Sequence, residues 1–104
     1  MMNSTDFEKL IAEIIREQSL IIGTSIARER AEDTGLIRFN SSKIDDISIL
    51  SSAEPGKIVS EIIGSYEELF GGASVEVCLE VIKKYDNKEL VNILPENLRK
   101  ALNG

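Results

Sequence analysis

Hydrophobic residues near the start of the chain recur at steps of three and four, which places side chains on one face of an α-helix. The pattern extends over residues 4–33 and predicts one long helix, straight or bent, that ends at Gly35. Gly23 interrupts it at a typical cost of about 1 kcal/mol relative to alanine, so a simple break near this residue is the alternative. The apolar positions are Phe7, Leu10, Ile11, Ile14, Ile15, Ile21, Ile22 and Ile26.

The hydrophobic pattern changes from helical spacing to alternation in the next segment. Residues 36–40 and 47–49 alternate apolar and polar side chains on either side of a polar connection, which predicts a short β-hairpin. Ser42 and Asp45 also have the spacing of a capping box, so one helical turn in this segment is the alternative.

Helical spacing returns in the second half of the chain. Pro55 is suited to the first turn of a helix, where its missing N–H costs nothing, and the pair Gly71 and Gly72 ends that helix. Ser74 is then predicted to cap the next helix, and Pro95 to break a later one. The predicted helical segments are residues 55–70, 74–85, 86–94 and 95–102.

These elements fit a single helical domain over residues 1–104. The fold class expected is mainly α, a compact bundle of four to five helices with a possible short β-hairpin near residues 36–50. Hydrophobic residues make up 42% of the chain, which is enough to build a core without cross-links.

Charge and composition exclude several kinds of partner. The chain carries 12 basic and 18 acidic residues, a net charge of −6, and this argues against a nucleic-acid or anionic-membrane surface. Apolar runs are only three or four residues long, far short of a bilayer span. Residues 1–9 do not resemble an export signal, and Cys78 is the single cysteine, so we expect a cytoplasmic protein.

Catalytic and metal-binding constellations are weak in this sequence. The chain has no histidine, which excludes Ser/His/Asp and Cys/His catalysis. Each remaining candidate has a plainer structural explanation, as a turn, a solvated face, a charged loop or a core thiol. We therefore predict no catalytic residue, no metal ligand and no cofactor. The candidates considered are an anion site at Gly71 to Ser74, the pairs Glu13/Glu17 and Glu76/Glu80, the pair Asp45/Asp46, and Cys78.

A helix of about 30 residues would be about 45 Å long, more than a domain of this size covers by itself. One row along it alternates steps of four and three, the spacing of a helix–helix interface. We call this row the N-terminal seam and predict it to be the contact with a second copy or a partner helix, with a plain intramolecular core face as the alternative. Its residues are Phe7, Ile11, Ile14, Gln18 and Ile21, and Ser25 continues the spacing.

Two rows of small residues suggest a close helix crossing inside the domain. The first row is Gly23, Ala27 and Ala31, and the second, with the same four-residue spacing, is Gly56, Ser60 and Gly64. If the two rows face each other, the backbones approach closely and Gly64 is needed at the crossing.

The function expected from these observations is a non-enzymatic protein–protein interaction module. It would be a small acidic subunit, adaptor or regulator that self-associates as a homodimer through the N-terminal helix or binds a protein partner. The alternative is a domain that binds a small molecule or a metal, possibly an enzyme, with a pocket between helices.

Overall fold

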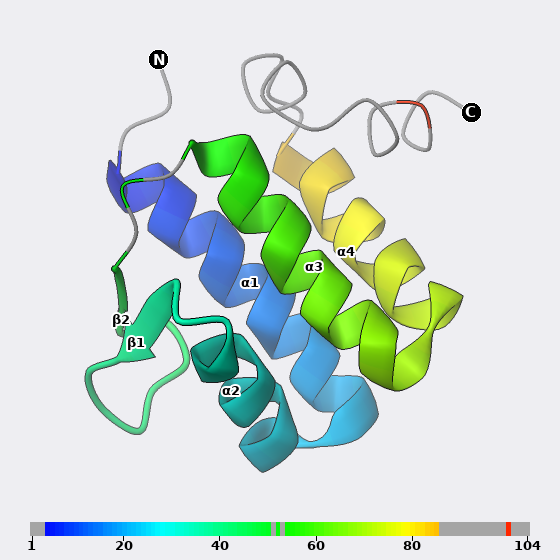
Figure 1. Ribbon diagram of the computed structural model, residues 1–104, viewed down its shortest axis with the longest axis horizontal. Helices are drawn as coiled ribbons and strands as arrows, with labels where there is room; N and C mark the ends of the chain where they lie inside the picture. The colour runs from blue at the N-terminus through cyan, green and yellow to red at the C-terminus, as the bar shows by residue number, and fades with distance from the viewer. Residues whose placement is uncertain (1–3, 51, 53, 86–99, 101–104) are drawn as a thin grey trace.

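The computed structural model describes residues 4–50, 52, 54–85 and 100 (Figure 1). The predicted mainly α class with a small hairpin is confirmed, and the described part of the chain holds four helices. The segments predicted at 86–94 and 95–102 lie outside the described residues, apart from residue 100. The elements are α1 (Ser4–Ile22), α2 (Thr24–Asp33), β1 (Ile37–Phe39), β2 (Ile47–Ile49), α3 (Pro55–Phe70) and α4 (Gly72–Tyr85).

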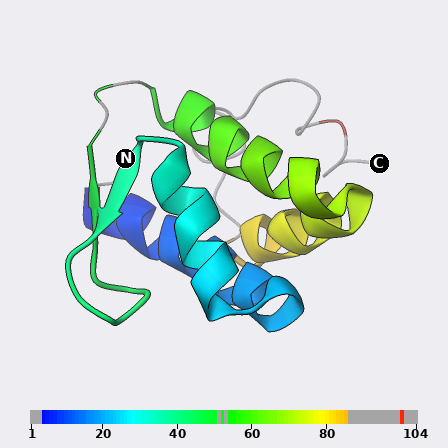
Figure 2. The same ribbon diagram turned by 60° about the horizontal axis from the view of Figure 1, so that its bottom comes forward.

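The four helices alternate in direction along the chain. Helices α1 and α3 run one way, and α2 and α4 run back (Figures 1 and 2). The turn at Gly23, between α1 and α2, and the turn at Gly71, between α3 and α4, therefore lie at one end of the bundle, which we call the turn end. The β-hairpin contacts α1 through β2 and α2 through β1.

The long helix predicted over residues 4–33 is broken at Gly23, so the prediction of one continuous rod is wrong and the alternative, a break near this residue, is confirmed. Gly23 has φ 90° and ψ 150°, a conformation that essentially only glycine adopts. Its N–H donates to the Ser19 carbonyl at 3.0 Å, and its carbonyl accepts from the Ala27 N–H at 3.0 Å. The chain reverses at this residue, and Ala27 and Ala31 become buried in the core instead of extending beyond it.

Glycine and proline mark most helix ends as predicted. Gly35 follows α2 with φ 74°, Pro55 lies in the first turn of α3, and Gly71 follows α3 with φ 68°. The cap predicted at Ser74 is wrong, because α4 already begins at Gly72. Ser74 is buried inside the first turn, and its N–H donates to the Gly71 carbonyl at 3.1 Å.

The hairpin prediction is confirmed over the helical-turn alternative. Strands β1 and β2 are antiparallel, with Ile37 opposite Ile49 and Phe39 opposite Ile47. Ile37 and Phe39 are buried while Arg38 between them is exposed, as strand alternation requires.

Arg28 of α2 fixes the hairpin against the helices. Its guanidinium lies 4.2 Å from the centre of the Phe39 ring and donates to the carbonyls of Ser41 and Ser42, each at 2.8 Å. A cation stacked on an aromatic ring and bonded to two carbonyls holds the connecting loop in place.

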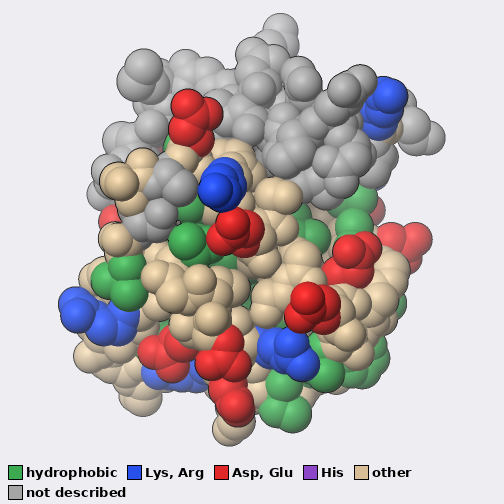
Figure 3. Space-filling view, viewed as in Figure 1, with side chains coloured by type: hydrophobic (Ala, Val, Ile, Leu, Met, Phe, Trp, Pro, Cys, Tyr) green, Lys and Arg blue, Asp and Glu red, His purple; other side chains and the backbone are tan. Residues whose placement is uncertain are grey.

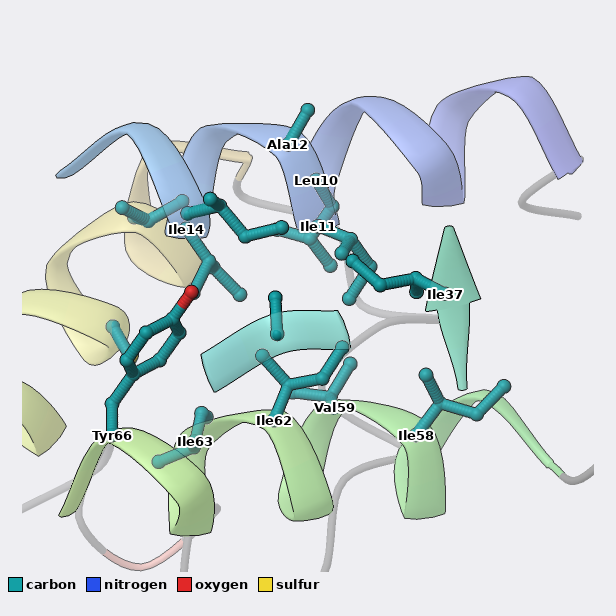
Figure 4. Packing of buried hydrophobic residues seen from close by; sticks show 14 of the residues in the cluster. Leu10, Ile11, Ala12, Ile14, Ile37, Ile58, Val59, Ile62, Ile63 and Tyr66 are labelled. Carbon is teal, nitrogen blue, oxygen red and sulfur yellow. The ribbon is translucent and has the colours of Figure 1, made fainter. Parts of the chain in front are cut away.

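Isoleucines of α1 and α3 form the centre of the core, and β1 closes one side of it (Figure 4). The side chains of Ile11 and Ile14 project from α1 toward Ile62 of α3. The predicted close crossing at Gly64 is wrong, because a Cβ atom added at Gly64 would meet no atom within 4 Å. Helix α2 instead contacts α3 through Ser65 and Tyr66, whose hydroxyls donate to carbonyls of α2.

Candidate functional site

Most of the N-terminal seam lies inside the chain's own core. Phe7, Ile11, Ile14 and Gln18 are buried, and only Ile21, 37% exposed, offers surface to another molecule. The reason is the break at Gly23, since α2 folds back and α4 packs along α1, and together with α3 they cover the row that a longer rod would have left open. Self-association of the chain stays a prediction, but these four side chains are already enclosed within one subunit.

Gln18 has a clear role in this structure, as a polar contact between α1 and α4. Its Nε2 donates to the Ser74 carbonyl at 3.0 Å and to Cys78 Sγ at 3.3 Å. A polar residue in an apolar row commonly fixes the register between helices. As a member of the N-terminal seam, Gln18 was predicted to contact another molecule, but its partners lie in α4 of the same chain.

Two polar atoms of this contact, Gln18 Oε1 and Ser74 Oγ, have no hydrogen-bond partner among the described residues. A buried acceptor without a donor costs about 1–3 kcal/mol. The contact between Gln18 and α4 therefore specifies how α1 and α4 align more than it stabilises the fold.

Tyr66 connects α3 to α2 across the core. Its hydroxyl donates to the Ala27 carbonyl at 2.7 Å, and burial raises the pKa of the phenol well above its usual range. Such a group stays protonated and serves as a donor. The geometry gives Tyr66 a structural role.

Replacing Tyr66 by phenylalanine is expected to lower the free energy of unfolding by about 1–2 kcal/mol, because the buried hydrogen bond is lost while the ring remains. Urea denaturation followed by circular dichroism measures the change. Ser65→Ala is the control, since its partly buried hydroxyl also donates from α3 to α2, to the Arg30 carbonyl at 3.2 Å. An equal loss in both variants would contradict the role of the buried hydroxyl.

Cys78 is a core thiol, as its position on the apolar face of α4 predicts. Burial raises its pKa to about 12, against a smaller lowering by the hydrogen bond from Gln18. The reactive thiolate is therefore scarce in the folded chain. Because the folded pKa lies above the unfolded one, the thiol's contribution to stability is complete below about pH 9 and is lost as the pH rises toward 12.

We expect Cys78 to resist alkylation in the native chain at about pH 8 and to react at the normal rate once the chain is unfolded by urea. Mass spectrometry follows the reaction at this single thiol. Labelling at the same rate with and without urea would show that Cys78 is accessible and would contradict its burial.

The acidic pairs predicted as solvated faces do not form joint sites. A carboxylate oxygen of Glu13 lies 3.1 Å from the Arg16 guanidinium within α1. A carboxylate oxygen of Glu80 lies 3.8 Å from Lys83 Nζ within α4. Within the described residues, no three potential ligands come together to hold a metal ion. No helix of that part of the chain is long and apolar enough to cross a membrane.

The other two candidate groups serve local structure. Asp46 accepts from the Asn40 side chain at 3.4 Å, and its backbone carbonyl accepts from the Asn40 N–H at 2.9 Å, so it closes the hairpin loop. Asp45 beside it is exposed. Gly71 to Ser74 form the turn between α3 and α4. An open depression on α2 is lined by polar residues, among them Arg28, which is already engaged with the hairpin.

The most distinctive surface feature is apolar. Six large hydrophobic side chains are exposed in the described part of the chain, and five of them lie at the turn end. Leu20 is the most exposed of the six, at 77%. We call these five residues the end surface; they are Leu20, Ile21, Ile26, Leu69 and Phe70.

Contacts between helices place the helix ends that carry the end surface near one another. Ser65 contacts Arg30, and four residues further toward the turn end lie Leu69 on α3 and Ile26 on α2. On the other side, the bond from Gln18 to Ser74 joins the last turns of α1 to the first turn of α4, directly after Phe70. Figure 3 shows hydrophobic side chains gathered at the ends of α1 and α3.

Comparison with protein-family models, with curated proteins and with solved structures found no match to this chain.

Proposed function

We propose that the protein is a non-enzymatic protein–protein interaction module that binds its partner through the end surface. The observation that carries the proposal is that five of the six large hydrophobic side chains exposed in the described residues lie at one end of the bundle. Monomeric proteins rarely leave such patches uncovered, and patches with a polar rim commonly mark sites of interaction.

The surroundings of the end surface support binding rather than catalysis. The titratable groups with shifted pKa values in the described residues are Tyr66 and Cys78, and both are enclosed in the core. Groups poised for proton transfer normally line an accessible cleft. The single buried thiol fits a reducing compartment, and a cytoplasmic location is part of the proposal.

The experiment compares which proteins copurify with three forms of the chain from the cells that naturally express it. They are the wild type, a double variant Leu20→Ser/Phe70→Ser at the end surface, and Leu50→Ser. Leu50 is the sixth exposed hydrophobic residue and lies outside the turn end, after β2, so it is a matched control.

We expect one partner to be retained by the wild type and by Leu50→Ser and to be lost from the double variant. All three substituted residues are exposed, so each variant should fold, which circular dichroism verifies. Equal loss from both variants, or no partner with any form, would contradict the proposal. Thermal stabilisation by a nucleotide or a divalent metal instead would favour the alternative of a ligand-binding domain.

A further inference from the structure

The charges around the end surface narrow the chemistry of its partner. Glu17 precedes Leu20 by one turn of α1, and Glu67 precedes Phe70 by one turn of α3. Glu76 lies in the second turn of α4, which begins at this end. Figure 3 shows acidic side chains over α3 beside the exposed hydrophobic ones.

These three carboxylates are not neutralised within the described residues. Arg16, next to Glu17 along α1, pairs with Glu13 at 3.1 Å, and Arg30 of α2 pairs with Glu68, next to Glu67, at 3.6 Å. No ion pair joins a described basic residue to the three carboxylates. In the part of the chain that the structure describes, the rim of the end surface therefore carries unpaired carboxylates.

The helix ends add negative charge of their own. Helices α1 and α3 both finish at the turn end, and neither has a basic residue in its last turn. The C-terminus of a helix carries a partial negative charge that lysine or arginine usually offsets. Here that complement is absent from both helices, so a cationic partner would supply it.

We propose that the end surface receives a cationic amphipathic helix from a partner protein, an inference that rests on the proposed function. The partner's hydrophobic side chains, spaced at three and four residues, would cover Leu20, Ile26 and Leu69. Its lysine or arginine side chains would lie against Glu17, Glu67 and Glu76. Opposite charge at the rim steers the partner and sets its orientation.

A second copy of the chain fits this surface less well. A symmetric dimer brings the same patch of both subunits together. The three carboxylates of one copy would then face those of the other, and like charges across an interface oppose association. The charge pattern thus favours a different, basic partner over self-association through the turn end.

The test titrates the isotope-labelled chain with a synthetic amphipathic peptide of about 18 residues, with leucine at three- and four-residue spacing and lysine on its flanks. A matched peptide carries glutamate in place of each lysine. Nuclear magnetic resonance maps the binding site residue by residue. We expect the cationic peptide alone to bind, with shifts concentrated in residues 17–26 and 67–76.

Two charge variants separate local recognition from general attraction, because each removes three carboxylates. Glu17→Gln/Glu67→Gln/Glu76→Gln is expected to weaken binding about tenfold and to flatten its salt dependence. Asp45→Asn/Glu54→Gln/Glu61→Gln changes residues away from the turn end and should leave the dissociation constant unchanged. Equal weakening in both variants, or shifts spread over the whole chain, would overturn the inference.

The outcomes also distinguish this inference from the proposed function. If a partner copurifies through Leu20 and Phe70 but neither peptide binds, the cationic helix is wrong and the interaction function stands. If sedimentation equilibrium shows a dimer that Leu20→Ser/Phe70→Ser dissociates, the occupant is a second copy and the inference is overturned. If no partner protein requires the end surface for binding, the proposed function itself is wrong, and the inference that rests on it falls with it.

Discussion

Replacing Ile14 by aspartate is expected to unfold the chain. Ile14 is fully buried between α1 and the facing helices, where no described cation lies to pair with a carboxylate. An unpaired charge in such a place costs about 5 kcal/mol or more, comparable with the whole stability of a small domain. Circular dichroism and urea denaturation of the variant measure the loss.

The control is Leu20→Asp, which introduces the same charge into the same helix at an exposed position. Its free energy of unfolding should fall by no more than about 1 kcal/mol, because the only cost is a negative charge in the last turn of the helix. A folded Ile14→Asp variant that has lost only self-association would contradict the assignment of the N-terminal seam to the core. That result would instead support the interface predicted from the sequence.

Substituting alanine for Gly23 is expected to lower the free energy of unfolding by about 2–3 kcal/mol. The space around Gly23 is open, so the cost arises from its positive φ and not from a clash. Alanine also favours continuing α1 into α2, the straight rod that the structure avoids. Thermal and urea denaturation measure the loss of stability. Sedimentation equilibrium shows whether a straightened α1–α2 helix produces a domain-swapped dimer.

Gly64→Ala is the matched control for Gly23→Ala. Gly64 lies inside α3, and it too has open space around it but no positive φ. Alanine there should raise the stability by about 0.5–1 kcal/mol, because it restricts the unfolded chain and favours the helix. Equal effects of the two substitutions would contradict the argument that the backbone conformation of Gly23 is what matters.

The elements of the fold were predictable where local chemistry decides them. Pro55 and Gly71 mark the ends of α3 in the sequence as they do in the structure. The alternation around Ile37 and Phe39 indicated strand β1 directly. These signals depend only on neighbours along the chain, which is why they survive folding unchanged.

The break at Gly23 was harder to predict from the sequence, because Ile22 and Ile26 keep a four-residue step across it. Two helices in series then show the same periodicity as one. Gly23 was the only residue in the sequence that indicated a turn. Its positive φ goes with the burial of Ala27 and Ala31 in the folded core.

The end surface depends on tertiary structure in the same way. Leu20 lies two residues after Gln18, on the opposite face of α1, and this offset from the apolar row was a signal available in the sequence. Leu69 by contrast belongs to the regular apolar stripe of α3. Its exposure follows from where the bundle ends, which no local pattern encodes.

The most direct test of the end surface is photo-crosslinking in the cells that naturally express the protein. A benzophenone amino acid placed at position 20, and in a second form at position 50, captures whatever lies against each side chain. We predict a discrete protein adduct from position 20 and none from position 50. Adducts of equal yield from both positions, or none from either, would contradict the claim that the turn end is where this protein meets its partner.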